Sequence, residues 1–129
     1  MQVRWDKNEI WLGKKPNGKR RATVPMTDTL RAELEVAYEG RETDRVIEFG
    51  GKSVDNPKKA FKRAVRKAGL KDFRFHDLRH TAAVWMCERG VPMEKISHYL
   101  GHSDIRVTMR VYAKYQPGHL ADAAAALEM

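Results

Sequence analysis

Cysteine is almost missing from this sequence of 129 residues, which contains Cys87 and no other. One cysteine cannot form a disulfide within the chain, and it cannot supply a zinc site built from several thiolates. So few cysteines are typical of a protein kept in a reducing cytoplasm. Cys87 follows Met86 in a half-apolar segment, so we expect it to contribute packing rather than chemistry.

Long apolar runs are missing as well. No segment approaches the roughly 20 consecutive apolar residues that a transmembrane helix needs, and no signal-peptide pattern opens the chain. We therefore predict a protein without a membrane partner. The length is enough for one domain with a real core but not comfortably for two.

Acidic residues are scarce relative to basic ones. The sequence has 17 Asp and Glu against 25 Lys and Arg, which gives a formal net charge of +8 and a pI of about 9.8. Such a surplus favours a polyanionic partner, with nucleic acid ahead of a membrane surface. Two segments contain basic residues and no acidic residue at all.

The first of these segments is a predicted hairpin. The residues from Val3 to Leu12 alternate loosely and predict a strand pair, or one strand and a turn, and Ala22 to Val24 predict the returning strand. Asn17 and Gly18 form a strong turn signal between them. Basic residues crowd around its tip at Lys14, Lys15, Lys19, Arg20 and Arg21. The lack of acid there makes phosphate contact at least as good an interpretation as a solvated turn.

The second segment is the clearest helix of the sequence. Asn56 can cap it, Pro57 takes the first helical position, and Gly69 ends it. Its apolar residues follow the helical period and predict a buried face: Ala60, Phe61, Ala64, Val65 and Ala68. The other positions are basic: Lys58, Lys59, Lys62, Arg63, Arg66 and Lys67. Like charges four residues apart repel by about a few tenths of a kcal/mol each. A helix that tolerates this repulsion indicates contact with phosphates rather than a plain solvated face.

Weaker signals predict the remaining elements. Thr27 can cap a helix that reaches about Glu39, with Leu30, Leu34 and Ala37 as its buried stripe. A short strand is expected at Arg45 to Phe49. Further helices are expected from Val91 to Leu100, from Asp104 to Tyr112 with Ser103 as the cap, and from Leu120 to Leu127. The pattern predicts a mixed α/β fold that is mainly helical, with a small antiparallel sheet.

The stretch around which these elements are organised runs from His76 to Gly90. Helical spacing places His76, Arg79 and Ala83 on one side. The opposite side is apolar and reads as the core-facing one: Leu78, Ala82, Trp85 and Met86. We therefore expect the basic side to be free to face a ligand.

The residue types along this stretch and downstream of it suit chemistry on a phosphate. An arginine matches the geometry of phosphate oxygens, and histidines can donate hydrogen bonds or move a proton near neutral pH. A tyrosine hydroxyl can act as a covalent nucleophile, and a lysine at a hairpin tip can act as an acid. Arg79, His76, His102, Tyr112 and Lys15 are the candidates for these roles.

Three groups of residues resemble the signature boxes of the tyrosine recombinases, the phage integrase family. They are His76, Asp77, Leu78, Arg79, His80 and Thr81; Leu100, Gly101, His102 and Ser103; and Val111 and Tyr112. The resemblance covers essentially the whole chain. It implies the fold of the DNA breaking-rejoining enzymes, and site-specific recombination that integrates or excises a phage or other mobile element. The implied mechanism uses a 3′-phosphotyrosyl intermediate, with no metal and no cofactor.

The resemblance also implies a role for each matching residue. Tyr112 is expected as the nucleophile, and Arg79 as the second arginine of the pair that clamps the phosphate. His76 matches a proton-handling histidine, and His102 matches a histidine that hydrogen-bonds the phosphate. The general acid is expected at Lys15, with Lys14 as an alternative. The implied partners are double-stranded DNA and, in the full-length protein, further copies that form a tetramer on DNA.

Two departures from the family pattern accompany this resemblance. The interval from His102 to Tyr112 is ten residues, one more than the commonest spacing, so Tyr115 competes for the nucleophile's role. The family's first catalytic arginine precedes the opening strands, and no residue here matches it, since Arg4 lies too late. We therefore expect residues 1–129 to be the C-terminal part of a single catalytic domain. On this reading the first arginine segment and the N-terminal DNA-binding domains are absent, and the chain alone is inactive.

Two alternatives stand beside this interpretation, and both explain less of the sequence. The first is a metal site, because His76 with His80, and His98 with His102, are paired at helical spacing. Asp77 stands where a zinc protease motif has glutamate, so we predict no metal. A non-catalytic DNA-binding module, with a helix-turn-helix at residues 93–112, explains the charge but not Arg79 and Tyr112. His80 itself is expected to cap or pack.

Overall fold

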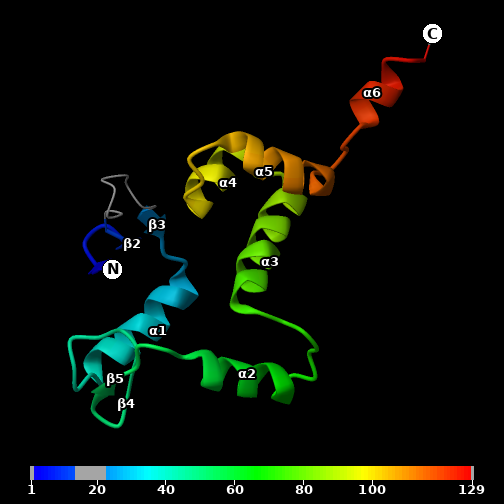
Figure 1. Ribbon diagram of the computed structural model, residues 1–129. Coiled ribbons are helices and arrows are strands. Elements are labelled where there is room, and N and C mark those ends of the chain that lie inside the picture. The colour runs from blue at the N-terminus through cyan, green and yellow to red at the C-terminus, as the bar shows by residue number, and fades with distance from the viewer. Residues whose placement is uncertain (1, 14–22, 129) are drawn as a thin grey trace. The chain divides into compact units, whose positions relative to one another are not determined.

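The computed structural model describes residues 2–13 and 23–128 (Figure 1). The predicted basic hairpin tip, which includes Lys14, Lys15, Lys19, Arg20 and Arg21, lies outside the described residues. The chain divides into two compact units, which are treated separately below. One unit comprises Val3–Ile10 and Pro25–Phe73, and the other is built mainly from residues 74–128.

A three-stranded sheet forms near the start of the chain. Its strands are β1 (Gln2–Arg4), β2 (Glu9–Trp11) and β3 (Thr23–Pro25), in the order β1-β2-β3. This arrangement confirms the predicted strand pair and returning strand. Asn8 takes a positive φ of 52° in the turn between β1 and β2, a conformation that asparagine tolerates better than most residues.

Helix α1 (Asp28–Glu39) begins where the sequence predicts. The Thr27 hydroxyl accepts a hydrogen bond from the amide of Leu30 at 3.2 Å, which caps the helix. Arg31 ties α1 to the β1–β2 turn by donating to the Trp5 carbonyl at 3.0 Å and to Asn8 Oδ1 at 3.2 Å. The predicted stripe of Leu30, Leu34 and Ala37 is wrong as a buried face, because no residue of α1 is buried.

A short hairpin and a second helix complete this unit. Strand β4 (Glu48–Phe49) pairs antiparallel with β5 (Lys52–Ser53), so the strand predicted at Arg45 to Phe49 is shorter than expected and has a partner that was not foreseen. Helix α2 (Lys58–Lys67) begins one residue later than predicted, with Pro57 as its cap residue. Its apolar face is only half-buried, at Phe61 and Val65, and the Phe61 ring lies 6.3 Å from that of Phe73.

In the other unit, three elements pack around α3 (Phe75–Glu88): α4 (Met93–Leu100), α5 (Ile105–Tyr112) and the 3-10 turn η1 (Ala113–Tyr115), as Figure 1 shows. The last helix, α6 (Ala121–Ala125), has only exposed residues. The buried cluster joins three of these helices through Ala83, Cys87, Ile96, Leu100 and Tyr112. The expectation that Cys87 contributes packing is confirmed, since its side chain is fully buried in this cluster.

Helix α3 departs from the prediction at several positions. Ala83, assigned to the free basic side, is fully buried, whereas Leu78 is 50% and Trp85 57% exposed. The predicted core side is therefore wrong at Leu78 and Trp85, whereas Met86 packs against the buried cluster as predicted. The reason is that the buried stripe is built from small residues, Ala83 and Cys87, whose weight in a hydrophobic pattern is less than that of leucine and tryptophan.

The end of α4 and the start of α5 show how the sequence sets the bounds of these two helices. Gly101 ends α4 with φ 67° and ψ 30°, a left-handed conformation that costs glycine little. The predicted cap at Ser103 is wrong by one residue, because Asp104 is the cap of α5 and its side chain accepts from the Arg106 amide at 2.9 Å. The mainly helical fold with small sheets is confirmed. Within the described ranges, no helix is long and apolar enough to cross a membrane.

The buried cluster predicts which aliphatic side chains stabilise the helical unit. Ile96→Ala should lower the free energy of unfolding by about 2–5 kcal/mol, because Ile96 is fully buried and alanine leaves a cavity. Leu127→Ala is the matched control: Leu127 is 81% exposed, so the change should stay within about 0.5 kcal/mol. Urea unfolding followed by circular dichroism measures both. Equal losses in the two variants would contradict this description of the core.

Candidate functional site

The beginning of α3 is fixed by a reciprocal cap. The Arg74 amide donates to Asp77 Oδ2 at 2.7 Å, and the Asp77 amide donates to the Arg74 carbonyl at 2.9 Å. The hydrogen bond from the Arg74 amide is the main reason why the pKa of Asp77 is lowered from its ordinary value. The Asp77 carboxylate is therefore ionised at neutral pH, and its negative charge interacts favourably with the positive N-terminal end of the α3 dipole. This cap sets the register for His76, Arg79 and His80, which follow within the first two turns.

Two histidines of α3 and the last residue of α5 form a continuous chain of contacts. The His76 and His80 rings meet edge to face, with centroids 4.6 Å apart and an interplanar angle of 84°. The Tyr112 ring centroid lies 5.8 Å from that of His80. A hydrogen bond joins His80 Nδ1 to Tyr112 Oη. The hydroxyl that the sequence singles out as a nucleophile is thus held by a histidine that the sequence did not single out.

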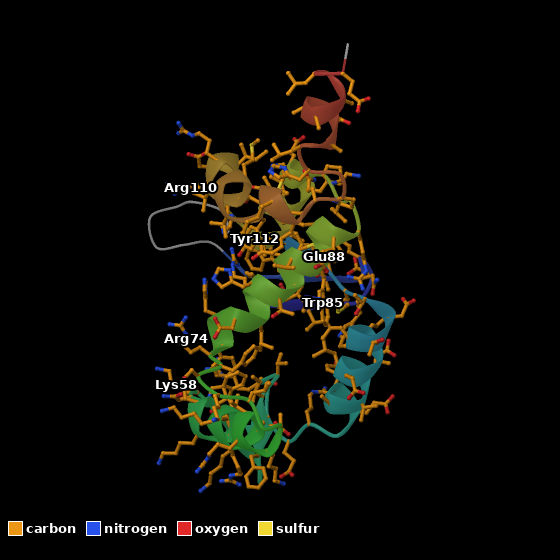
Figure 2. The ribbon with its side chains drawn as sticks, turned by 90° about the vertical axis from the view of Figure 1, so that its right-hand side faces the viewer. Lys58, Arg74, Trp85, Glu88, Arg110 and Tyr112 are labelled. Carbon is orange, nitrogen blue, oxygen red and sulfur yellow. The ribbon has the colours of Figure 1, made fainter. Side chains whose placement is uncertain are left out.

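Tyr112 belongs to the core as well as to this contact chain. Its side chain is 3% exposed, and Figure 2 shows it beside α3. Burial raises the pKa of the Tyr112 hydroxyl, and the positive charge of Arg79 partly opposes this effect. The hydroxyl is therefore protonated at neutral pH and has a proton that it can donate. Tyr115, the competing tyrosine, lies in η1 and is 38% exposed, with the Lys114 ammonium 5.1 Å from its ring centroid.

Arg79 connects α3 to the end of α4. Its Nη2 donates to the carbonyl oxygen of Leu100, the last residue of α4. An arginine is favourable there because the final carbonyls of a helix carry partial negative charge and lack partners within the helix. The guanidinium has further donors that this single bond does not use. Its charge lowers the pKa of His102 and opposes the rise at Tyr112, so it acts on both residues.

His102 follows Gly101 in the short connection between α4 and α5. Its Nδ1 lies 2.8 Å from Thr108 Oγ1, a hydroxyl on the fully buried Thr108 of α5. Burial lowers the pKa of His102, and the positive charges of Arg79 and His76 lower it further. The imidazole is therefore neutral at neutral pH, so it takes part through hydrogen bonds rather than as a cation. A Thr108 hydroxyl that donates to Nδ1 leaves Nε2 as the nitrogen that carries the proton.

The structure thus brings four of the five predicted site residues into one unit: Tyr112, Arg79, His76 and His102. The fifth, Lys15, lies outside the described residues. The six basic residues of α2 belong to the other unit, and all of them are exposed. The side chains around Lys58 extend away from the helix (Figure 2).

His80 and Thr108 are the residues that the sequence prediction missed. His80 had a signal, since it stands four residues after His76 and helical spacing puts the two rings on one side. Thr108 had none, because a threonine inside a helix looks the same in the sequence whether it is exposed or faces a histidine. Among the described residues, no group of three or more His, Cys, Asp or Glu side chains is placed to share a metal ion.

The contact between Thr108 and His102 can be tested through stability. Thr108→Val keeps the shape of the side chain but removes its hydroxyl, so Nδ1 of His102 loses its partner. The free energy of unfolding should fall by about 1–3 kcal/mol. Thr108→Ser keeps the hydroxyl and is the matched control, with a smaller loss from the missing methyl group. Urea unfolding at pH 7.5 measures both, and a valine variant as stable as the original chain would show that this hydrogen bond contributes nothing.

Known proteins resemble this chain in sequence and in structure. The family model described as the phage integrase family matches residues 1–119. The integrase of Salmonella phage P22 is 43% identical over 65 residues, which cover 50% of this chain and 16% of that integrase. The tyrosine recombinase XerA of Pyrococcus furiosus is 29% identical over 129 residues, which cover 94% of this chain and 44% of the recombinase. The chain thus spans less than half the length of either relative.

A solved structure extends the likeness to the fold. The catalytic domain of bacteriophage HP1 integrase superposes with a TM-score of 0.65 and 28% sequence identity. The match covers 98% of this chain and 67% of that domain. It supports the predicted fold class, mainly helical with small antiparallel sheets. Together, the family match over residues 1–119 and this superposition show that the chain belongs to the phage integrase family.

Proposed function

We propose that this chain forms part of the catalytic domain of a site-specific DNA recombinase, which cuts and rejoins strands through Tyr112. The observation that carries the proposal is the position of the Tyr112 hydroxyl. It is hydrogen-bonded to His80, within the electrostatic reach of Arg79, and in the same helical unit as His76 and His102. A tyrosine that served packing alone would have no need of a basic cluster around its hydroxyl.

The proposed reaction exchanges one phosphodiester for another. Tyr112 Oη attacks the phosphorus, the bond from phosphorus to the 5′ oxygen breaks, and the 3′ phosphate remains joined to the protein. The tyrosine loses its proton, and the departing 5′ oxygen gains one. Because the number of phosphodiester bonds is unchanged, the step needs no external energy source, and attack by a 5′ hydroxyl of a second strand reverses it.

The other residues of the cluster would stabilise the transition state. Arg79 would hold non-bridging phosphate oxygens with guanidinium donors that its bond to Leu100 leaves available. A neutral His102 would donate from Nε2 to another of these oxygens, and His76 would handle a proton. Lys15 is proposed as the acid that protonates the departing oxygen, with Lys14 as the alternative. The proposed partner is duplex DNA, on which the full-length protein would act as a tetramer.

Charge on α2 supports the proposed DNA partner. Lys58, Lys62 and Arg66 repeat at helical spacing on a surface without acidic residues, and all three are exposed. Cations that lack internal partners cost little to bring against phosphates, and the release of counterions from DNA then favours binding. This basic face is proposed to contact the DNA backbone rather than base edges. Contacts between lysine or arginine and phosphates depend on charge and do not distinguish one base sequence from another.

The nucleophile is tested by trapping the covalent adduct. Residues 1–129 are assayed alone and joined behind a segment that supplies the family's first arginine, with a pool of nicked duplexes of randomised sequence. Tyr112→Phe should abolish the denaturant-resistant adduct of the joined protein and leave DNA affinity nearly unchanged, since only a hydroxyl is lost. Tyr115→Phe is the matched control and should keep the adduct. An adduct that survives in Tyr112→Phe and disappears in Tyr115→Phe would move the role to Tyr115, and survival in both would show that neither tyrosine is the nucleophile.

The basic face of α2 is tested by the salt dependence of binding. The logarithm of the affinity should fall with the logarithm of the salt concentration, by about 0.9 per phosphate neutralised. Replacing Lys62, Arg63 and Arg66 by alanine should flatten this slope by roughly two or three units. A control that replaces the exposed Lys7, Arg45 and Lys52 removes the same charge elsewhere and should change the slope less. Fluorescence anisotropy measures both, and equal slopes in the two variants would contradict a contact at α2.

A further inference from the structure

We propose that His80 is the group that accepts the proton from Tyr112 when this tyrosine attacks DNA. The inference rests on the proposed function, because it assigns a residue to the same reaction. It starts from the hydrogen bond between His80 Nδ1 and Tyr112 Oη, which joins α3 to the end of α5. A proton acceptor must lie within hydrogen-bond reach of the proton that it takes, and His80 meets this requirement before any DNA is bound.

The direction of the hydrogen bond fits this role. The buried Tyr112 hydroxyl keeps its proton at neutral pH, so it has a proton to donate, and Nδ1 of His80 is proposed as the acceptor. His80 is then the neutral tautomer that carries its proton on Nε2. As the bond from Oη to phosphorus forms, the Oη–H bond breaks and the proton moves to Nδ1, so His80 becomes an imidazolium. When a 5′ hydroxyl later attacks and Tyr112 leaves, the same proton returns to Oη.

The surroundings of His80 favour the charge that this step creates. Asp77 lies close enough for His80 to lower the pKa of its carboxyl group, although the Arg74 amide contributes more to that shift. An ionised Asp77 thus stabilises a positive charge on His80. Arg79, the neighbouring residue, opposes it. The His76 ring packs edge-on against the His80 ring and limits its rotation. Activated nucleophiles in proteins are typically hydrogen-bonded to a base that a third group orients. Tyr112, His80 and the two neighbours of His80 follow this pattern.

The other histidines of the cluster are placed for different work. Nδ1 of His102 is taken by Thr108, which leaves Nε2 for a phosphate oxygen. His76 packs against the His80 ring, with ring centroids 4.6 Å apart. His80 is therefore the histidine that the structure places on the reacting oxygen. The sequence expectation that it caps or packs leaves this contact unexplained.

The test separates proton transfer from positioning. His80→Asn places Oδ1 near the location of Nδ1, so it can accept the hydrogen bond but cannot take the proton. His80→Ala removes both abilities. In the joined protein, single-turnover adduct formation should slow by about 10²–10⁴-fold in both variants, which is the usual contribution of general acid–base catalysis. DNA affinity should stay within about twofold, because no phosphate contact is lost. If a melting curve shows that the asparagine variant does not fold, the alanine variant and the ring spectra described below test the inference.

Several outcomes would overturn the inference. An asparagine variant that forms adduct at the original rate would show that His80 only positions Tyr112. An alanine variant that reacts faster would show that the hydrogen bond restrains the nucleophile instead of activating it. In either case the adduct itself would still support the proposed function. A joined protein with no adduct, while it binds DNA, would overturn the proposed function and the role of His80 with it.

The hydrogen bond can also be tested without any reaction. Long-range ¹H–¹⁵N spectra of the histidine rings in residues 1–129 report which nitrogen carries the proton. We expect His80 to carry it on Nε2, with Nδ1 as an acceptor, and Tyr112→Phe should shift the Nδ1 resonance. Tyr115→Phe, which keeps the Tyr112 hydroxyl, should leave it in place. A proton found on Nδ1 in the original chain would exclude His80 as the acceptor, whatever the adduct assays show.

Discussion

The burial of the Tyr112 side chain against α3 is the interaction on which the helical unit depends. Two small residues, Ala83 and Cys87, form the buried stripe of α3, and small side chains allow another helix to approach closely. Tyr112 closes this space from α5, while Ile96 and Leu100 close it from α4. One packing arrangement therefore holds the three helices together and brings the Tyr112 hydroxyl to His80. Stability and the candidate chemistry share the same contact.

The positive charge of Arg79 is a second feature that links the residues of the candidate site. Arg79 acts on both His102 and Tyr112, and its bond to the Leu100 carbonyl anchors it at the end of α4. Asp77 is the acidic group tied to this region, and its carboxylate accepts from the start of α3 rather than from Arg79. The positive charge of Arg79 is thus not cancelled by a carboxylate in the described contacts. On the proposed function, a phosphodiester would supply the matching negative charge.

The sequence predicted where the helices and strands lie better than it predicted which of their faces are buried. The Thr27 cap and the helix that ends at Leu100 were predicted because the cap chemistry and the hydrophobic period are local. The face of α3 was wrong because Leu78 and Trp85 outweigh Ala83 in any hydrophobic pattern, although close helix packing selects the small residue. The candidate site residues other than Lys15 lie in one unit of the structure, and their roles stay predictions. His80 and Thr108 were missed because their importance comes from partners 32 and 6 residues away, and such pairing exists only in the folded chain.

A nucleophile that is also a core residue faces a conflict between packing and reach. Tyr112 is almost fully enclosed, yet a hydroxyl that attacks phosphorus must meet it in line and at close range. Moving Tyr112 outward empties the space between α3 and α4, and an unfilled space of this size is costly in a small helical unit. DNA would have to compensate for that loss with contacts of its own. On the proposed function, the enclosed resting position would prevent strand breaks at sites where the protein binds only weakly, because weak contacts cannot offset the opening of the core.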